Sequence, residues 1–317
     1  MAVRFKSPEY FRGASAAGSG MFAGMLPAEI TRWYIDRAEA MGATVIDRAQ
    51  VADDVRALYR IKAFEQPFFC AWSSWWATKT KTLEGTTGLI DRMIGLGPVN
   101  LAGKSYRRFT TTTGAPYTAG EPRLIRPGAG AGAPYIQIES RQKSSGEFVQ
   151  GALVTDSLTL PAGLVYAGRS FKSQSGEAEI GFGAYRDANY VFKLGRGAAF
   201  VRSVAGVEAS AGYAGGVPAQ SDAVYAGGIC ETLGGFVSPI VNGGRVESGD
   251  SIHSGATVDQ AFPDPASYPM RIGQNVRCSE IEDYRDHGQL VDMVFAVCKD
   301  EFVAGAIEVY FQSRYLS

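Results

Sequence analysis

The sequence predicts a mainly β protein: an antiparallel β-sandwich preceded by a short helical pair and an extended N-terminal arm. Residues 178–204 contain three runs in which apolar residues recur at every second position, the spacing of strands that bury one face. Turn residues separate the runs at 186–189 and 195–197, as in an antiparallel meander. The 39 glycines follow no collagen-like period, which indicates many tight turns between short strands. Helical periodicity is clear only near the N-terminus.

Residues 1–26 are rich in small residues and show no period. They are consistent with a disordered terminus or with an arm that becomes ordered against a neighbouring subunit. The alternative is that the arm folds back on its own sandwich. Large apolar residues are spaced along it as single anchors: Phe5, Tyr10, Phe11, Met21, Phe22 and Met25.

A helical pair is predicted over residues 27–64. Pro27 suits the first turn of a helix, and Gly42 suits the position after its last turn. Between them one helical face carries Ile30, Trp33, Tyr34, Ala38 and Met41. In the second helix Asp47 is a good N-cap, with Gln50 in the capping-box position and Ile46 and Val51 placed for a hydrophobic staple. Its apolar face continues to about Lys62.

Residues 65–317 are assigned to the β-sandwich domain. Pro67 blocks a further helix, so the aromatic segment around it predicts a strand or a strand pair. Further strand candidates lie at 135–141, 148–160 and 163–171, followed by the meander and a Gly-rich, irregular region at 205–290. Residues 293–298 are apolar on both sides, as in a central covered strand. Alternation over 303–311 predicts a long final strand.

Composition excludes several classes of partner. The chain has 31 basic and 32 acidic side chains without a basic cluster, which argues against a nucleic-acid surface. No run approaches the ~18 apolar residues of a membrane span. The four cysteines, Cys70, Cys230, Cys278 and Cys298, are far apart and no secretory signal precedes them. We therefore expect free thiols and synthesis in the cytoplasm.

Catalytic motifs are missing from the sequence. There are two histidines, and neither a nucleophile elbow nor a metal-binding motif is present. The segment from Gly97 to Ser105 has five residues between its glycines instead of the four of a phosphate-binding loop, and β-like sequence follows it. We expect no catalytic residue, no metal and no cofactor. Glu177 and Glu179 are interpreted as solvated surface charge, although a pair of acids for sugar hydrolysis stays open.

The aromatic segment supplies the candidates for ligand binding, Trp72, Trp75 and Trp76. Tryptophan rings stack on sugars, but packing of large aromatics in a core is the commoner use. Trp75 and Trp76 are adjacent, so they do not share a face of a strand.

The overall order of segments resembles a group of tailed-bacteriophage virion proteins whose main domain is a concanavalin A-like (laminin G-like) jelly roll. The likeness is carried by residues 28–101, with the helices WYIDRAEAMGATVIDRAQVADDVRALYRIKAF, the strand PFFCAW and the loop GLIDRMIGLGPVNLAG. The segment GEAEIGFGAYRDANYVFKLG is similar to the mid-domain strands of that fold. The resemblance covers about two thirds of the chain. It defines no catalytic or ligand-contacting residue.

The resemblance implies a non-enzymatic structural component of a virion: a tail, fibre or head-surface protein, synthesised in the host cytoplasm. Its expected partners are other virion proteins, further copies of itself and, in addition, a glycan of the host surface. The alternatives are a carbohydrate-binding module and a polysaccharide-degrading enzyme on the same scaffold.

Overall fold

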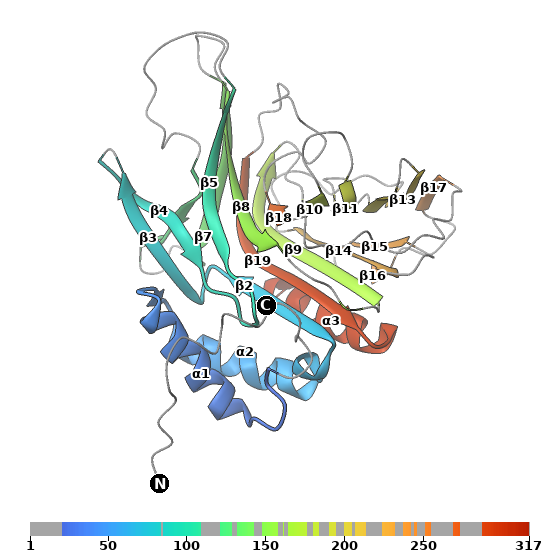
Figure 1. Cartoon of the computed structure of the whole chain (residues 1–317), viewed down its shortest axis with the longest axis horizontal. Helices are drawn as coiled ribbons and strands as arrows, with labels where there is room; N and C mark the ends of the chain where they lie inside the picture. The colour runs from blue at the N-terminus through green and yellow to red at the C-terminus, as the bar shows by residue number, and fades with distance from the viewer. Residues whose placement is uncertain are drawn as a thin grey trace.

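The protein folds as a mainly antiparallel β structure with three α-helices among the described residues, as a computed structural model shows (Figure 1). The structure describes residues 21–83, 85–108, 121–128, 132–142, 148–157, 161, 164–175, 180–183, 190–194, 200–204, 207–213, 224–231, 237–241, 244–245, 251–254, 269–272 and 287–316. Every strand pairing within these ranges is antiparallel. The predicted fold class, an antiparallel β-sandwich behind a helical pair, is confirmed.

The helices are α1 (Pro27–Ala40), α2 (Arg48–Arg60), the 3₁₀ turn η3 (Ala63–Glu65) and α3 (Glu301–Leu316). The strands of the first half are β1 (Thr44–Val45), β2 (Phe68–Ser73), β3 (Ala77–Leu83), β4 (Thr86–Met93), β5 (Leu101–Arg108), β6 (Arg123–Ile125), β7 (Tyr135–Gln142), β8 (Phe148–Ser157) and β9 (Leu164–Ser175). Those of the second half are β10 (Ile180–Gly183), β11 (Tyr190–Leu194), β12 (Phe200–Val204), β13 (Val207–Tyr213), β14 (Val224–Glu231), β15 (Val237–Val241), β16 (Gly244–Arg245), β17 (Ser251–Ser254), β18 (Pro269–Ile272) and β19 (His287–Cys298).

The strands form two layers, and the helices cover the outside of one of them (Figure 1). The helix-covered layer runs β2–β19–β9–β14–β15–β16, and the other runs β3–β4–β5–β8–β18–β10–β11–β12–β13–β17. Strand β7 joins the layers because it pairs with both β19 and β8. Strands β12 and β13 lie against β15 without pairing with it, so the layers face each other there.

Strand β2 separates two hydrophobic cores. Phe68, Cys70 and Trp72 point into the core between the β layers, whereas Phe69 and Ala71 point into the core beneath the helices. Strand β19 is divided in the same way, with Met293, Phe295 and Val297 on the first side and Val294, Ala296 and Cys298 on the second. Both faces of β19 are thus covered, as the apolar run at 293–298 predicted.

The helical pair begins and ends where its sequence predicted, but the predicted capping box of Gln50 does not form. Gly42 adopts φ +71°, the left-handed conformation that ends a helix at little cost for glycine. At the start of α2 the Asp47 carboxylate accepts a hydrogen bond from the Gln50 backbone N–H (2.9 Å). The Gln50 side chain donates instead to Asp54 (2.8 Å).

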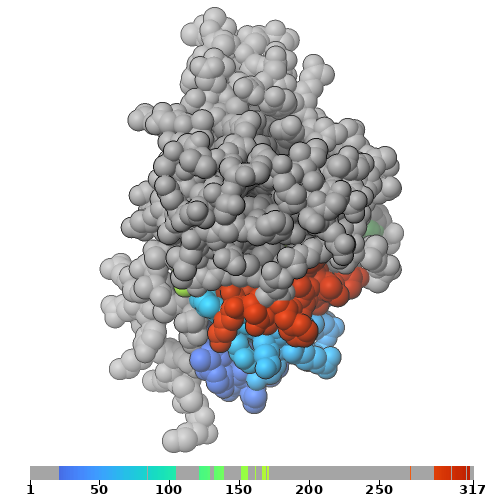
Figure 2. Space-filling view, turned by 90° about the vertical axis from the view of Figure 1, so that its right-hand side faces the viewer, coloured from blue at the N-terminus to red at the C-terminus, as the bar shows by residue number. Residues whose placement is uncertain are grey.

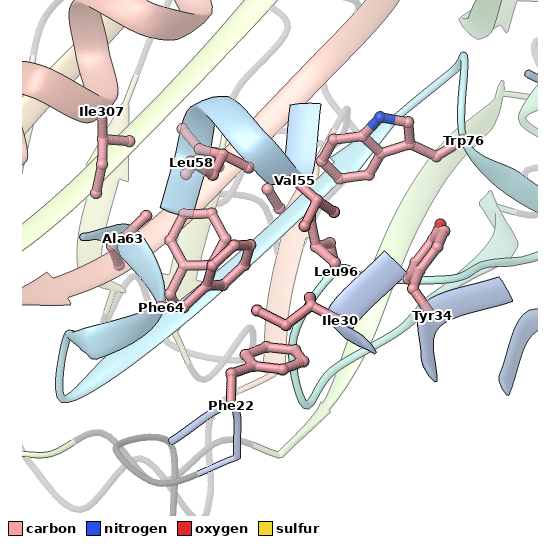
Figure 3. Packing of buried hydrophobic residues seen from close by; sticks show 14 of the residues in the cluster. Phe22, Ile30, Tyr34, Val55, Leu58, Ala63, Phe64, Trp76, Leu96 and Ile307 are labelled. Carbon is pink, nitrogen blue, oxygen red and sulfur yellow. The ribbon is translucent and has the colours of Figure 1, made fainter. Parts of the chain in front are cut away.

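Residues 21–26 pack on the protein's own helical core. Phe22 is buried near Phe64 (Figure 3). Its ring lies 5.1 Å from Trp33 and 5.0 Å from Phe64, both edge-on. Met21 and Met25 pack against the same core. This end of the predicted arm therefore packs on its own chain, on the helical core and not between the layers of the sandwich. Residues 1–20 lie outside the described residues.

The prediction of a long final strand over 303–311 is wrong, because these residues belong to α3. Val303, Ala304, Ile307 and Phe311 are buried, and their spacing of three or four is that of one helical face. The helix begins where the Asp300 carboxylate accepts from the Val303 N–H (3.0 Å). The strand was predicted because apolar residues recur at every second position, but this segment has apolar residues on both faces, so the same residues also fit a helical spacing.

The meander is confirmed: β10 pairs with β11, and β11 with β12. The region 205–290 is more regular than predicted, since it contributes β13 to β18 and the start of β19. Glu177 and Glu179 lie outside the described residues. No helix in the part of the chain that the structure describes is long and apolar enough to span a membrane.

Candidate functional site

Buried ionisable side chains gather where α2 and α3 meet the sheet. Asp54 of α2 is 2% exposed, Asp292 of β19 is 1% exposed and Arg314 of α3 is 11% exposed on its side chain. Glu308 of α3 is also buried. Burying a charge is costly unless the charge is paired. We call Asp54, Asp292 and Arg314, which pair with one another, the charge cluster.

Asp54 accepts hydrogen bonds from donors in α2, in α3 and in the turn between β2 and β3. Its Oδ2 accepts from Trp76 Nε1 (2.6 Å), and its Oδ1 accepts from Gln50 Nε2 (2.8 Å) and from the Tyr310 hydroxyl. Burial raises the pKa of Asp54 above its ordinary value, while Arg314 and the hydrogen bonds from Tyr310 and Trp76 act in the opposite direction. The three hydrogen bonds thus hold the Asp54 carboxylate in one orientation.

Arg314 bridges two carboxylates. Its Nη2 lies 3.2 Å from Asp54 Oδ2 and its Nη1 lies 3.3 Å from Asp292 Oδ2. The guanidinium also lies 6.0 Å from the centre of the Tyr310 ring. Because Asp54 belongs to α2 and Asp292 to β19, one side chain near the end of α3 is tied to both the helical layer and the sheet.

Tyr310 acts as a donor in this cluster. Burial raises the pKa of its hydroxyl, and the neighbouring Asp54 charge adds to the rise. The hydroxyl therefore keeps its proton and donates it in the hydrogen bond to Asp54. Within the described residues, no three His, Cys, Asp or Glu side chains gather as metal ligands would. The charge cluster and Tyr310 together fix α3 on the sheet, and we call these four residues the clamp.

A second set of hydrogen bonds, donated by Arg37 of α1, holds the loop between β4 and β5 in place. Arg37 Nη1 donates to the carbonyls of Gly95 and Gly97 (2.8 Å each), and Nη2 donates to Asn100 Oδ1 (2.9 Å). A Cβ on Gly97 would lie 2.4 Å from the Phe69 carbonyl oxygen, so the loop approaches β2 closely. The strand β5 follows it, as expected for a segment that is not a phosphate-binding loop.

The three tryptophans predicted as ligand-binding candidates lie in two different environments. Trp72 and Trp76 are fully buried, and each indole N–H has a partner inside the protein: the Val99 carbonyl (3.1 Å) for Trp72 and Asp54 for Trp76. Trp75 is partly buried against the helical-side core. The structure does not bring the three rings onto one surface, since Trp72 points into the sandwich core and Trp76 into the helical-side core.

The surface of α3 that faces away from the clamp carries two large apolar side chains. Phe302 is 84% exposed and Val309 is 57% exposed. Seven residues are almost two helical turns, so both side chains lie on one face, with Gly305 and Ala306 between them. Figure 2 shows α3 on the outside of the molecule beside α2. We call Phe302, Gly305, Ala306, Val309 and Ser313 the outer face of α3.

Neither the charge cluster nor the outer face of α3 was predicted from the sequence. Asp54 interrupts the apolar face of α2, and Arg314 follows a mainly apolar segment; each is a signal for a buried charge with a partner. Phe302 and Val309 were hidden because the segment was interpreted as a strand, in which their separation of seven places them on opposite faces.

Comparisons with known proteins identify no family. No family model matches the chain, and no curated protein matches it. Among solved structures, the chain is similar to the binding domain of botulinum neurotoxin serotype C1 (10% identity, TM-score 0.37), with 74% of this chain and 51% of that one covered. It is also similar to the globular domain of T. cruzi calreticulin (10% identity, TM-score 0.35; 62% of this chain and 88% of that one). A third is domain 4 of the arabinanase AbnA from Geobacillus stearothermophilus in complex with arabinotriose (10% identity, TM-score 0.32; 65% and 87%). The chain spans about half the length of the neurotoxin domains that it matches.

Proposed function

We propose that this chain is a non-enzymatic structural component of a bacteriophage virion that contacts its neighbours through the outer face of α3. The observation that carries the proposal is the exposure of Phe302 and Val309 on a helix whose other face is buried. A surface helix of a globular protein normally carries charged and polar residues outward, whereas a helix that is apolar all round is normally buried. The outer face therefore has the composition of a contact surface.

The charge cluster supports this proposal because it fixes the orientation of α3. Rotating the helix to bury Phe302 would pull Arg314 from Asp54 and Asp292 and would leave buried charges without partners. A surface that is held in its bound orientation before binding loses less conformational freedom when a partner docks. The assignment to a virion comes from the resemblance carried by residues 28–101.

Complementation of particle assembly tests the proposal. The double variant Phe302→Ser/Val309→Ser should fold but be depleted from purified particles, because it removes the exposed apolar surface and leaves the clamp intact. Leu26→Ser is the matched control, since Leu26 is a large apolar residue that is 60% exposed outside α3. Incorporation of the double variant at the level of the control would contradict the proposal.

Carbohydrate binding is the second candidate. One similar structure concerns neurotoxin type C, whose cell entry depends on two ganglioside molecules, and another holds arabinotriose. With TM-scores of 0.37 and 0.32 the likeness itself carries no argument about a ligand. A glycan array probed with the whole chain decides the matter: retention of a host polysaccharide supports a binding module, and release of oligosaccharides supports an enzyme.

A further inference from the structure

The outer face of α3 also indicates what kind of partner it fits. We infer that it binds the same face of a second copy of this chain, with the two α3 helices antiparallel across a two-fold axis near Gly305 and Ala306. The inference rests on the proposed function, in which the outer face is a contact surface. It adds the identity of the partner and the geometry of the contact.

The face is self-complementary under a two-fold rotation. Along the helix it presents a large side chain (Phe302), two small residues (Gly305 and Ala306) and a second large side chain (Val309). The order large–small–large is the same in both directions. In an antiparallel pair each Phe302 lies beside Val309 of the other copy, and the small residues let the two helices approach closely where they cross.

Among the side chains that the structure describes, the charges on and near the face do not oppose this contact. All five residues of the outer face are uncharged, and Arg314 is turned inward to Asp54 and Asp292. The exposed charges of Lys299 and Asp300 precede the helix. In the antiparallel pair they therefore lie just beyond the stretch over which the two helices overlap, away from the two-fold axis.

The size of the contact favours a partner that is present in many copies. Helix α3 has 16 residues, so it is about 24 Å long. A contact between two such helices falls below the roughly 1,200 Å² of a stable interface and is typical of a weak, transient pair. Such a pair becomes effective where copies are held at high local concentration, as in a repeating assembly.

Cysteine cross-linking of the full chain tests the geometry. In the antiparallel pair position 306 lies next to its own symmetry mate, whereas position 313 lies about 22 Å along the axis from its mate. Ala306→Cys should therefore form covalent dimers under mild oxidation, and Ser313→Cys, the matched control, should not. Cross-linking at both positions would indicate parallel helices, and cross-linking at neither would indicate no pair; either result overturns the inference.

Sedimentation equilibrium tests the energetics. Phe302→Ser should weaken self-association about a hundredfold, because in a symmetric pair one substitution removes both contacts between Phe302 and Val309. Leu26→Ser should leave self-association unchanged, and thermal unfolding confirms that each variant is folded. Equal self-association of Phe302→Ser and the parent chain overturns the inference.

Two further results separate this inference from the proposed function. If deleting residues 2–20 is required before Ala306→Cys cross-links, the protein's own N-terminal segment occupies the face and the inference is overturned. If Ala306→Cys never cross-links but Phe302→Ser/Val309→Ser is still depleted from particles, the face binds a different virion protein. In that case the inference fails and the proposed function stands.

Discussion

Removing the Asp54 carboxylate is the sharpest perturbation of the helical layer. Asp54→Ala deletes the acceptor for Trp76, Gln50 and Tyr310 and leaves Arg314 with Asp292 as its carboxylate in the charge cluster. Asp53→Ala is the matched control on the same helix. Asp53 forms an ion pair with Arg56, and both side chains are more than half exposed.

The two substitutions should differ by several kcal/mol in the free energy of unfolding. Breaking a buried ion pair by removing one partner costs about 3–5 kcal/mol. Arg314 keeps Asp292 in this variant, but the donors of Trp76, Gln50 and Tyr310 lose their acceptor, which adds to the cost. An exposed pair contributes about 0.5 kcal/mol, because solvent screens it. With about 2–4 °C per kcal/mol for a domain of a few hundred residues, Asp54→Ala should lower Tm by roughly 10 °C and Asp53→Ala by at most about 2 °C.

Differential scanning calorimetry and urea unfolding measure the two free energies. In native-state hydrogen exchange Asp54→Ala should also speed exchange in α3, because Arg314 and Tyr310 tie this helix to α2 and β19. Equal losses of stability for Asp53→Ala and Asp54→Ala would refute the conclusion that the cluster clamps α3.

Three further predictions follow from single sites. Because the folded-state pKa of Asp54 is raised above 3.8, the folded protein binds this proton more tightly than the unfolded chain. The free energy of unfolding should thus fall as pH rises through the interval above 3.8, and urea unfolding at a series of pH values should show a smaller fall for Asp54→Asn. Gly97→Ala should destabilise the protein, since the new Cβ would lie 2.4 Å from the Phe69 carbonyl oxygen and φ is +145°. Gly305→Ala, with open space around the new methyl group, should stabilise α3 by up to about 1 kcal/mol. Urea unfolding of both variants measures the two changes in the free energy of unfolding. Cys70 and Cys298 are free and buried, and burial raises the pKa of each thiol to about 12, so both should resist a thiol reagent in the native protein and react once it is unfolded; rapid native labelling of either would contradict their placement.

The fold could be predicted from the sequence where local periodicity and tertiary burial agree. The helical face ending at Gly42, the N-cap Asp47 and the alternating strands from Ile180 to Val204 all follow from such local patterns. The segment from Val303 to Phe311 does not, because valine, isoleucine and aromatic residues on both faces satisfy a period of two as well as a helical spacing. Its helical state is decided by the Asp300 cap and by packing against β9, β14 and β19.

The candidate site could not be predicted because its members are far apart in the chain. Asp54 and Arg314 are 260 positions apart in the sequence and meet only when α3 docks on the sheet. Trp76 illustrates the same point. The sequence suggests that its ring could stack on a sugar, whereas in the structure its indole N–H donates a hydrogen bond to Asp54 inside the core. The exposure of Phe302 depends on the orientation of α3, which the clamp sets.

Side-chain footprinting with hydroxyl radicals, applied to the isolated chain and to the assembled particle, tests the central claim most directly. Phe302 should be oxidised readily in the isolated chain, where it is 84% exposed, and should be protected in the particle. Leu26, which is 60% exposed outside α3, serves as the internal reference and should be oxidised in both. Equal oxidation of Phe302 in the isolated chain and in the particle would contradict the claim that the outer face of α3 is the contact surface.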